Sequence, residues 1–275
     1  MKKIISSVIK YIILIFLAIY TLAPLVFLFI NSFKSQDEID TSAMALPRNW
    51  DLKYIVSAMR DIHFFKALLI TVLVTVLSVG IIVLVSAFSA WMLVRNNNKV
   101  SKFLLLLFIS AMLIPFQSLM YPLIDMADKI HLKNIFGLIF MYGGFGLSLS
   151  IFLYHGFIKS ISKSIEEAAI IDGANIFQIF FHVVMPLLRP TTITVIILNA
   201  MWIWNDYLLP FLVLANSDAK TLTLELYFAK MQASQYGNPW ELIFPAVLIS
   251  IVPVIIVYVF LQKYIIKGIS DGAVK

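Results

Sequence analysis

The chain between residues 67 and 94 reads ALLITVLVTVLSVGIIVLVSAFSAWMLV and carries no charged side chain. About 20 consecutive apolar residues are enough for a helix to cross the hydrocarbon core of a bilayer. Lipid offers no hydrogen-bond partner to the backbone, so a run of this length is predicted to be a membrane-spanning helix. Comparable runs lie at about 11–31, 103–124, 136–158, 191–213 and 242–262. The sequence therefore predicts an all-α membrane protein with about six transmembrane helices, in one domain over residues 1–275.

The composition supports a membrane protein and excludes several other classes. Hydrophobic residues make up 61% of the chain, charged residues 13%, and the mean hydropathy is +0.95. Soluble domains have about 45–50% apolar and about 25% charged residues. The net charge of +6 does not indicate a nucleic-acid partner, because the basic residues are spread over short segments between apolar runs. The absence of cysteine excludes disulfides and Cys-ligated zinc, and the four scattered histidines predict no metal site.

The distribution of Lys and Arg predicts the orientation of the chain. The first apolar run, 11–31, is too long for the apolar region of a signal peptide and is followed by no small-residue cleavage site, so we expect a retained helix. With the N-terminus inside, 12 of the 21 basic residues fall on inner segments, among them Arg95, Lys99 and Lys102 in one turn. Six spans then return the C-terminus to the cytoplasm.

Proline and small residues inside the predicted spans indicate kinks and close helix packing. Pro115 and Pro122 lie in the third span, Pro210 is predicted to end the fifth, and Pro245 and Pro253 to interrupt the sixth. In the fourth span the pairs Gly144/Ser148 and Gly146/Ser150 have the spacing that lets helices approach closely.

The hydrophilic stretch 159–190 reads KSISKSIEEAAIIDGANIFQIFFHVVMPLLRP and predicts two short helices. Ser164 followed by Glu167 has the spacing of a capping box, which predicts a helix start. Glu166 and Glu167 then lie in the first turn, where the helix dipole favours negative charge. Gly173 is predicted to end this helix in a left-handed conformation. A second helix is expected over about 175–184, so the stretch should form a helix–Gly–helix elbow on the cytoplasmic face.

Ala168 and Ala169 make the first elbow helix a candidate docking surface, because side chains this small let another protein approach closely. The alternative is an amphipathic helix resting on the membrane. Such helices usually carry Lys or Arg on their polar face, whereas this one begins with acidic residues and alanines.

Three segments of this stretch carry a family resemblance. Residues 167–169 (EAA), 172–174 (DGA) and 186–190 (PLLRP) resemble the EAA loop of binding-protein-dependent ABC importer permeases. The resemblance implies a cytoplasmic coupling loop, about 159–190, that docks into a cleft on a separate ATPase. It implies these coupling residues: Glu166, Glu167, Ala168, Ala169, Asp172, Gly173, Ala174 and Pro186.

Two further segments are similar to the carbohydrate subfamily of the maltose-permease-G type. They are residues 204–211 (WNDYLLPF) and the tail over 261–275. This resemblance implies a sugar importer, with oligosaccharides as the expected cargo, in a bacterial plasma membrane. It implies three kinds of protein partner besides lipid: a second six-helix permease, two ATPase subunits and an extracellular sugar-binding protein. It implies no cofactor in this chain, because ATP and Mg are bound by the ATPases.

Five polar or aromatic residues within spans are candidates for the substrate path. Asn199, Trp202 and Asp206 are spaced to share one helical face, on which a ring could stack on a sugar while polar groups bind its hydroxyls. Gln117 and Tyr121 share a face in the third span. The alternative is that Asn199 and Asp206 bond neighbouring helices of a partner permease.

Other functions remain open at this level. The chain lacks Gly-x-x-x-x-Gly-Lys-Ser/Thr, so it is not expected to bind ATP phosphates or act as an enzyme. The alternatives are an ion-coupled secondary transporter, an ABC permease for a solute other than sugar, and a membrane assembly factor. An ion-coupled transporter should show an inverted repeat of broken helices, which the sequence does not display.

The outer stretches 32–66 and 214–241 have two possible interpretations. They are predicted to be either ordinary solvated loops or a docking surface for the external binding protein.

Overall fold

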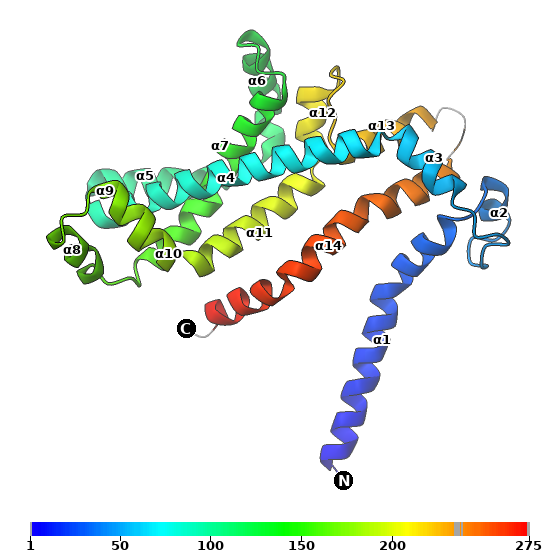
Figure 1. Cartoon of the computed structure of the whole chain (residues 1–275), viewed down its shortest axis with the longest axis horizontal. Helices are drawn as coiled ribbons and strands as arrows, with labels where there is room; N and C mark the ends of the chain where they lie inside the picture. Colours follow the sequence, from blue (N-terminus) through cyan, green and yellow to red (C-terminus); the bar gives the residue numbers. More distant parts are fainter. Residues whose placement is uncertain (1, 234–236, 238, 274–275) are drawn as a thin grey trace. The chain divides into compact units, whose positions relative to one another are not determined.

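The described part of the chain is helical. The computed structural model describes the backbone of residues 2–233, 237 and 239–273, and the side chains of residues 7, 9–231, 237 and 239–259. Within these residues the regular structure consists of helices, without strands (Figure 1). The helices form two compact units: Met1–Ala67 with Glu225–Val257, and Leu68–Leu224 with Tyr258–Lys275. A single permease domain over residues 1–275 stays a prediction.

Within the described residues, four helices are long and apolar enough to cross a membrane. They are α1 (Lys2–Asn31), α4 (Phe64–Asn96), α7 (Ile135–Ile158) and α14 (Trp240–Ala273). Two pairs of bent helices raise the number to as many as six if each pair forms one span. The predicted all-α membrane fold with about six spans is confirmed. Pro245 and Pro253 lie inside the continuous helix α14, so the prediction that they interrupt the sixth span is wrong.

The third predicted span is sharply bent. Helices α5 (Lys99–Ala111) and α6 (Phe116–Lys129) meet at an angle of 101°. Pro115 is the N-cap of α6 and has an extended backbone. Proline lacks an N–H to donate to the preceding turn, so α5 cannot continue through this position. Pro122 lies within α6 without ending it.

The fifth predicted span is divided into α11 (Arg189–Asn205) and α12 (Leu208–Leu214). Pro210 falls in the first turn of α12, so the prediction that it ends the span is wrong. A proline clashes with the carbonyl four residues before it and gives that carbonyl no N–H. The affected carbonyl belongs to Asp206. The backbone of Asp206 is extended (ψ 131°), and its carbonyl accepts a hydrogen bond of 2.8 Å from the Thr223 hydroxyl instead. The proline therefore moves the break to Asp206.

In the unit formed by Met1–Ala67 and Glu225–Val257, the stretch 32–66 contains α2 (Gln36–Thr41) and α3 (Lys53–Asp61). The loop between them is fastened to the end of α1. The Lys34 ammonium donates to the carbonyls of Ser42 and Ala43, both at 3.1 Å, and the Asn31 amide donates to Ala43 at 3.0 Å. Helix α13 (Leu222–Ala233) leads toward α14.

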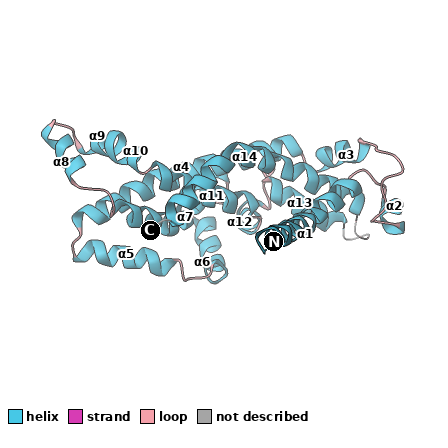
Figure 2. Ribbon diagram, turned by 90° about the horizontal axis from the view of Figure 1, so that it is seen from below, coloured by secondary structure: helices cyan, strands magenta, loops and turns pink. Residues whose placement is uncertain are grey.

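The core of the unit Leu68–Leu224 is built where α4, α7 and α11 pack together (Figures 1 and 2). A Cβ atom at Gly146 would lie 2.3 Å from Ile82 Cδ1 and 2.7 Å from Asn199 Oδ1, so a larger residue there would displace the side chains of α4 and α11. Gly146 and Ser150 are buried, which confirms the predicted close packing for this pair. Gly144 has no neighbour within 4 Å of such an atom, so the pair Gly144/Ser148 does not make a comparable contact within the described chain.

Candidate functional site

The predicted elbow is present, and Gly173 forms its corner. Helix α8 (Ser164–Ile171) is followed by Gly173 at φ +82°, a left-handed conformation that glycine adopts without steric cost. The N–H of Ala174 donates to Ala169 O and that of Gly173 to Ile170 O, both at 3.0 Å. This pair of bonds is a Schellman motif, which satisfies carbonyls at the end of a helix. The predicted left-handed cap is confirmed.

The capping box lies on the second helix of the elbow rather than the first. The N-cap of α8 is Lys163, without a side-chain bond, so the predicted box of Ser164 with Glu167 is wrong. The Ser164 hydroxyl instead contacts that of Ser162 at 2.7 Å. The Asn175 side chain accepts from the N–H of Gln178 at 3.0 Å, and the Gln178 side chain accepts from the N–H of Asn175 at 2.8 Å. The second helix therefore starts from a reciprocal cap that the sequence interpretation missed.

The second elbow helix is longer than predicted and contains a π-helical turn. It runs through α9 (Ile176–Gln178), the π-helix η1 (Ile179–Val184) and α10 (Met185–Leu187). Pro186 is exposed in α10, where it cannot donate an N–H to an earlier turn. The chain then bends by 79° into α11. In both views the elbow lies at one end of α4 (Figures 1 and 2).

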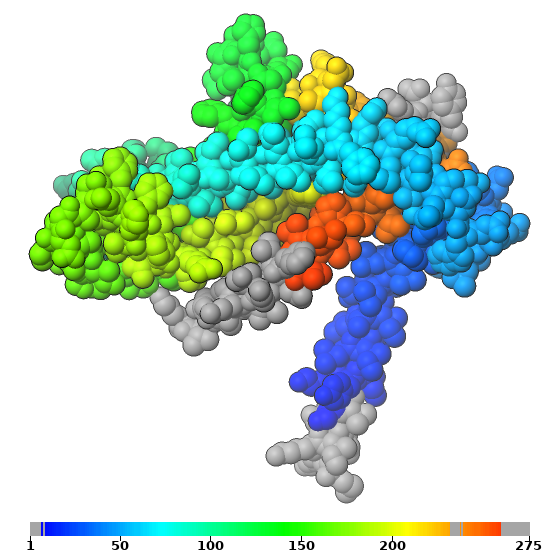
Figure 3. Space-filling model, in the orientation of Figure 1, coloured from blue at the N-terminus to red at the C-terminus, as the bar shows by residue number. Residues whose placement is uncertain are grey.

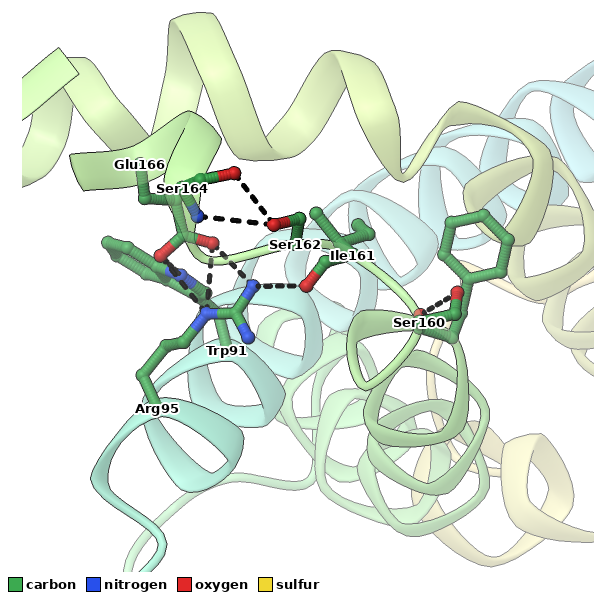
Figure 4. A network of polar contacts seen from close by, with 8 residues as sticks. Trp91, Arg95, Ser160, Ile161, Ser162, Ser164 and Glu166 are labelled. Atoms are coloured by element: carbon green, nitrogen blue, oxygen red, sulfur yellow. Dashed lines mark hydrogen bonds and ion pairs between the residues drawn. The ribbon is translucent and has the colours of Figure 1, made fainter. Parts of the chain in front are cut away.

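A buried ion pair attaches the first elbow helix to α4. Glu166 is only 7% exposed, and its carboxylate lies 2.6 Å from Arg95 Nη2. Arg95 Nε donates to both carboxylate oxygens, at 2.9 and 3.1 Å, and the Trp91 indole donates to Glu166 at 3.0 Å. Figure 4 shows these three side chains converging from α4 and α8. A planar guanidinium that binds a carboxylate through two nitrogens fixes direction as well as distance.

Aromatic packing attaches the second elbow helix to the same turn of α4. The Phe180 ring stacks on Trp91 with centroids 5.7 Å apart and meets Phe88 edge-on at 5.1 Å. Phe180, Ile179 and Val184 are buried. Trp91 therefore contacts both elbow helices, through its N–H and through its ring face, so the elbow and the end of α4 are held as one element.

The outer surface of the elbow is exposed in the part of the chain that the structure describes. Glu167, Ala168, Asp172 and Gly173 are exposed, and Ala169 and Ala174 are partly exposed. Ile171 is 85% exposed, and Ile170 lies beside it at 60%. Figure 3 shows this segment (yellow-green) projecting at one end of the unit Leu68–Leu224. Small and apolar side chains on a projecting turn form a surface suited to a protein partner.

The candidate path residues are placed in different environments. Asn199 is buried, and its amide donates to Ser150 at 3.0 Å and to the carbonyl of Val195 at 2.8 Å. Its partner side chain thus lies in α7 of the same chain. Gln117 and Tyr121 lie on α6, and both are exposed, Tyr121 at 85%.

Trp202 and Asp206 meet at Tyr142, a residue that sequence analysis did not identify. The Tyr142 hydroxyl donates to Asp206 Oδ2 at 2.9 Å, and its ring meets Trp202 edge-on at 5.3 Å. Asp206 Oδ1 accepts from the N–H of Leu208, the first residue of α12, at 2.9 Å. Trp202 remains 42% exposed. The group combines an accessible aromatic ring with a carboxylate held in place from two sides.

The contacts missed from sequence follow from chain folding. Trp91 and Arg95 are four residues apart at the end of a span, a spacing that weakly indicates a shared helical face. No local sequence feature predicts that Glu166 is their partner. Tyr142 gives no signal within an apolar helix. Among the described residues no group of three or more His, Asp or Glu is placed to hold a metal ion. The tail motif over 261–275 lies outside the described side chains.

Comparison with known proteins places this geometry in a family. Residues 82–271 match the family model of the binding-protein-dependent transport system inner membrane component. The chain is 41% identical over 261 residues to the probable starch degradation products transport system permease protein AmyC of Thermoanaerobacterium thermosulfurigenes, covering 95% of this chain and 94% of that protein. It is 35% identical to the multiple sugar-binding transport system permease protein MsmG of Streptococcus mutans, over 97% and 96% of the two chains.

A solved structure agrees with these matches. The chain resembles a chain of a bacterial ABC transporter involved in the import of the acidic polysaccharide alginate, with a TM-score of 0.79, 25% identity, and coverage of 94% of this chain and 96% of that one. The matched region contains α5 to α12 and hence the whole elbow. The chain belongs to the family of inner-membrane permease components of binding-protein-dependent transport systems.

Proposed function

We propose that this chain forms half of the translocation path of an ATP-driven sugar importer, with oligosaccharides as its cargo. The relatives AmyC and MsmG are named for starch degradation products and for multiple sugars, which supports a carbohydrate substrate. The elbow is the observation that supports the coupling role. Its exposed surface has small side chains, and a buried ion pair attaches it to the end of α4.

The proposed assembly contains a second six-helix permease, two ATPase subunits and an extracellular sugar-binding protein. ATP and Mg belong to the ATPases, and this chain contributes no catalytic residue. Both termini lie in the cytoplasm of a bacterial cell, which puts the elbow on the side of the ATPases. This orientation rests on the distribution of basic residues, with Arg95, Lys99 and Lys102 next to the elbow.

In the proposed coupling step, the ATPase cleft closes on the exposed face formed by Glu167, Ala168 and Gly173. Displacement of α8 is carried to α4 through Glu166 and Arg95, and displacement of the second elbow helix through Phe180 and Trp91. Because α4 is a single helix of 33 residues, motion at the elbow reaches the far end of a membrane span. The coupling residues Asp172, Ala174 and Pro186 shape the corner and the second helix.

The proposed path includes Trp202 and Asp206, with Gln117 and Tyr121 as further polar groups and Asn199 behind them. An accessible ring next to an oriented carboxylate can stack on a sugar and bind its hydroxyls. Asn199 is engaged with Ser150, so it contributes by holding α7 against α11.

The absence of cysteine provides a direct test of the coupling role. We expect a single cysteine at position 168, introduced as Ala168→Cys, to cross-link to the ATPase in the assembled transporter through a short bifunctional reagent. Lys129→Cys, at the exposed end of α6, is the matched control and should give no such product. Cross-linking at both positions, or at neither, contradicts the docking assignment.

Reconstituted vesicles test the transport role. Uptake of labelled oligosaccharide should require ATP and the binding protein, and should persist when ion gradients are collapsed. Uptake that follows an imposed ion gradient without ATP would instead identify a secondary transporter.

A further inference from the structure

A cationic cavity of about 380 Å³ lies where α4 ends, α5 begins and α7 ends. Its walls include five groups that are basic or can become so: Arg95, Lys102, His155, Lys159 and Lys163. Asn97 and Ser101 add polar groups, and no acidic residue is among the described residues that line it. The cavity lies within the unit Leu68–Leu224 and is separate from the candidate path at Asp206.

Most of this positive charge has no counterion among the residues that the structure describes. Arg95 is neutralised by Glu166 on its other side. The ammonium groups of Lys102, Lys159 and Lys163 form no ion pair with any residue that the structure describes. Like charges gathered around one cavity repel each other, and an anion between them would remove that repulsion. The chemistry of the walls therefore fits a phosphate group that carries negative charge.

The position of the cavity indicates which phosphate it holds. It lies beside the ends of two candidate membrane spans, Phe64–Asn96 and Ile135–Ile158. The ends of membrane spans lie at the depth of the lipid headgroups. Directly beyond Lys102, helix α5 exposes an apolar face, with Phe103 and Leu106 each 64% exposed and Leu107 49%. Leu105 lines the cavity itself. A cationic cavity that continues into an apolar helix face matches a ligand with a phosphate and acyl chains.

We propose that this cavity binds the headgroup of an anionic phospholipid such as phosphatidylglycerol, whose phosphate lies between Lys102, Lys159 and Lys163. The bound lipid also braces the coupling elbow. Lys163 is the residue from which α8 begins, and Arg95 donates to the carbonyl of Ile161, another wall of the cavity, at 3.3 Å. The lipid thus joins α5, the end of α7 and the start of the elbow from the membrane side.

Lipid retention in nanodiscs tests this proposal without relying on transport. The full-length chain in its assembled transporter is placed in nanodiscs of phosphatidylcholine with a minority of phosphatidylglycerol, and retained lipid is counted by native mass spectrometry. The wild type should retain phosphatidylglycerol in preference to phosphatidylcholine. A basic residue near an anionic membrane surface contributes about 1 kcal/mol, which corresponds to about a fivefold change in binding. Each lysine removed should therefore lower the retention of phosphatidylglycerol about fivefold. The double variant Lys102→Gln, Lys159→Gln should lower it about 25-fold.

Lys99→Gln is the matched control, because Lys99 begins the same helix, is exposed and does not line the cavity. It should retain lipid as the wild type does. Equal retention of the two lipids by the wild type, or an equal loss in the Lys99 variant, overturns the proposal.

Chemical labelling of the wild type tests the same lipid site even if the variants fail to assemble. Acetylation of Lys102 and Lys159 should be slower in nanodiscs with phosphatidylglycerol than in pure phosphatidylcholine, while Lys99 reacts equally in both. The same protection by inorganic phosphate in phosphatidylcholine nanodiscs would assign the cavity to a soluble anion and contradict the lipid assignment.

Discussion

The guanidinium of Arg95, at the end of α4, forms an ion pair of 2.6 Å with the carboxylate of Glu166 in the first turn of α8. The adjacent glutamate, Glu167, is exposed. Two neighbouring acids in one helical turn therefore have different roles: one attaches the elbow to its own chain, and the other is available to a partner.

Glu166→Gln should loosen the elbow, whereas Glu167→Gln should not. Replacing the carboxylate leaves the partly buried Arg95 without its counterion, and a hydrogen bond to a charged group is worth about 1.5–3 kcal/mol. We expect faster hydrogen exchange at the amides of residues 164–171 in the Glu166 variant of the purified chain. Unchanged exchange there, or an equal effect of Glu167→Gln, would show that the ion pair does not hold α8.

Gly173→Val should lower ATP-linked uptake, while Gly173→Asn should retain most of it. No atom lies within 4 Å of a Cβ built at this position, so the penalty comes from φ +82° rather than from a clash. A left-handed conformation costs an ordinary L-residue about 1–2 kcal/mol, and Asn tolerates it better than Val. The measurement is uptake per assembled transporter. Equal uptake by the two variants would mean that the left-handed corner is dispensable.

Ala168→Arg should prevent ATPase binding without affecting the fold of the chain. Ala168 is exposed, so a long side chain is accommodated in the isolated permease but blocks a close-fitting cleft. Co-purification of the ATPase should be lost while thermal stability of the permease stays unchanged. Normal co-purification would contradict the assigned docking face.

Gly146→Ala should destabilise the permease, whereas Gly144→Ala should not. The added methyl group at 146 would lie 2.3 Å from Ile82 and 2.7 Å from Asn199, whereas the one at 144 meets nothing within 4 Å. Overpacking of this kind costs about 1–3 kcal/mol. Thermal denaturation in detergent compares the two variants. A shift of the same size in both would mean that helix propensity rather than packing sets the effect.

Trp202→Ala and Asp206→Asn should alter the affinity or rate of transport, with the larger effect on longer sugars. A lost sugar hydrogen bond or stacking contact should cost about 1–3 kcal/mol. Tyr142→Phe is the informative companion, because it keeps the ring against Trp202 and removes only the bond of 2.9 Å to Asp206. Uptake kinetics should show a smaller effect for Tyr142→Phe than for Asp206→Asn. Unchanged uptake in all three assembled variants would assign these residues to packing alone.

Local chemistry made several features predictable. The apolar runs predicted the helical membrane fold because lipid leaves the backbone no other way to satisfy its hydrogen bonds. Gly173 predicted the corner of the elbow because a left-handed residue after a helix is most often glycine. Both are properties of a few consecutive residues.

Predictions from the sequence were wrong where two possible helix caps competed, or where a proline acted on a residue several positions away. Ser164 and Glu167 have capping-box spacing, yet α8 begins from Lys163 and the reciprocal cap forms at Asn175 and Gln178. Pro210 was expected to end a helix, but its effect falls four residues earlier, on the carbonyl of Asp206.

The sequence by itself determined that this chain is a helical membrane protein with a helix–Gly–helix elbow, because hydropathy and backbone conformation act over single segments. Only the tertiary structure decided which of the two adjacent glutamates is buried. The interaction that buries Glu166 joins residues 71 positions apart, Arg95 and Glu166, and depends on the packing of α4 against the elbow. The same holds for Asp206 and Tyr142, 64 positions apart, since a side-chain partner across a helix interface has no local signature.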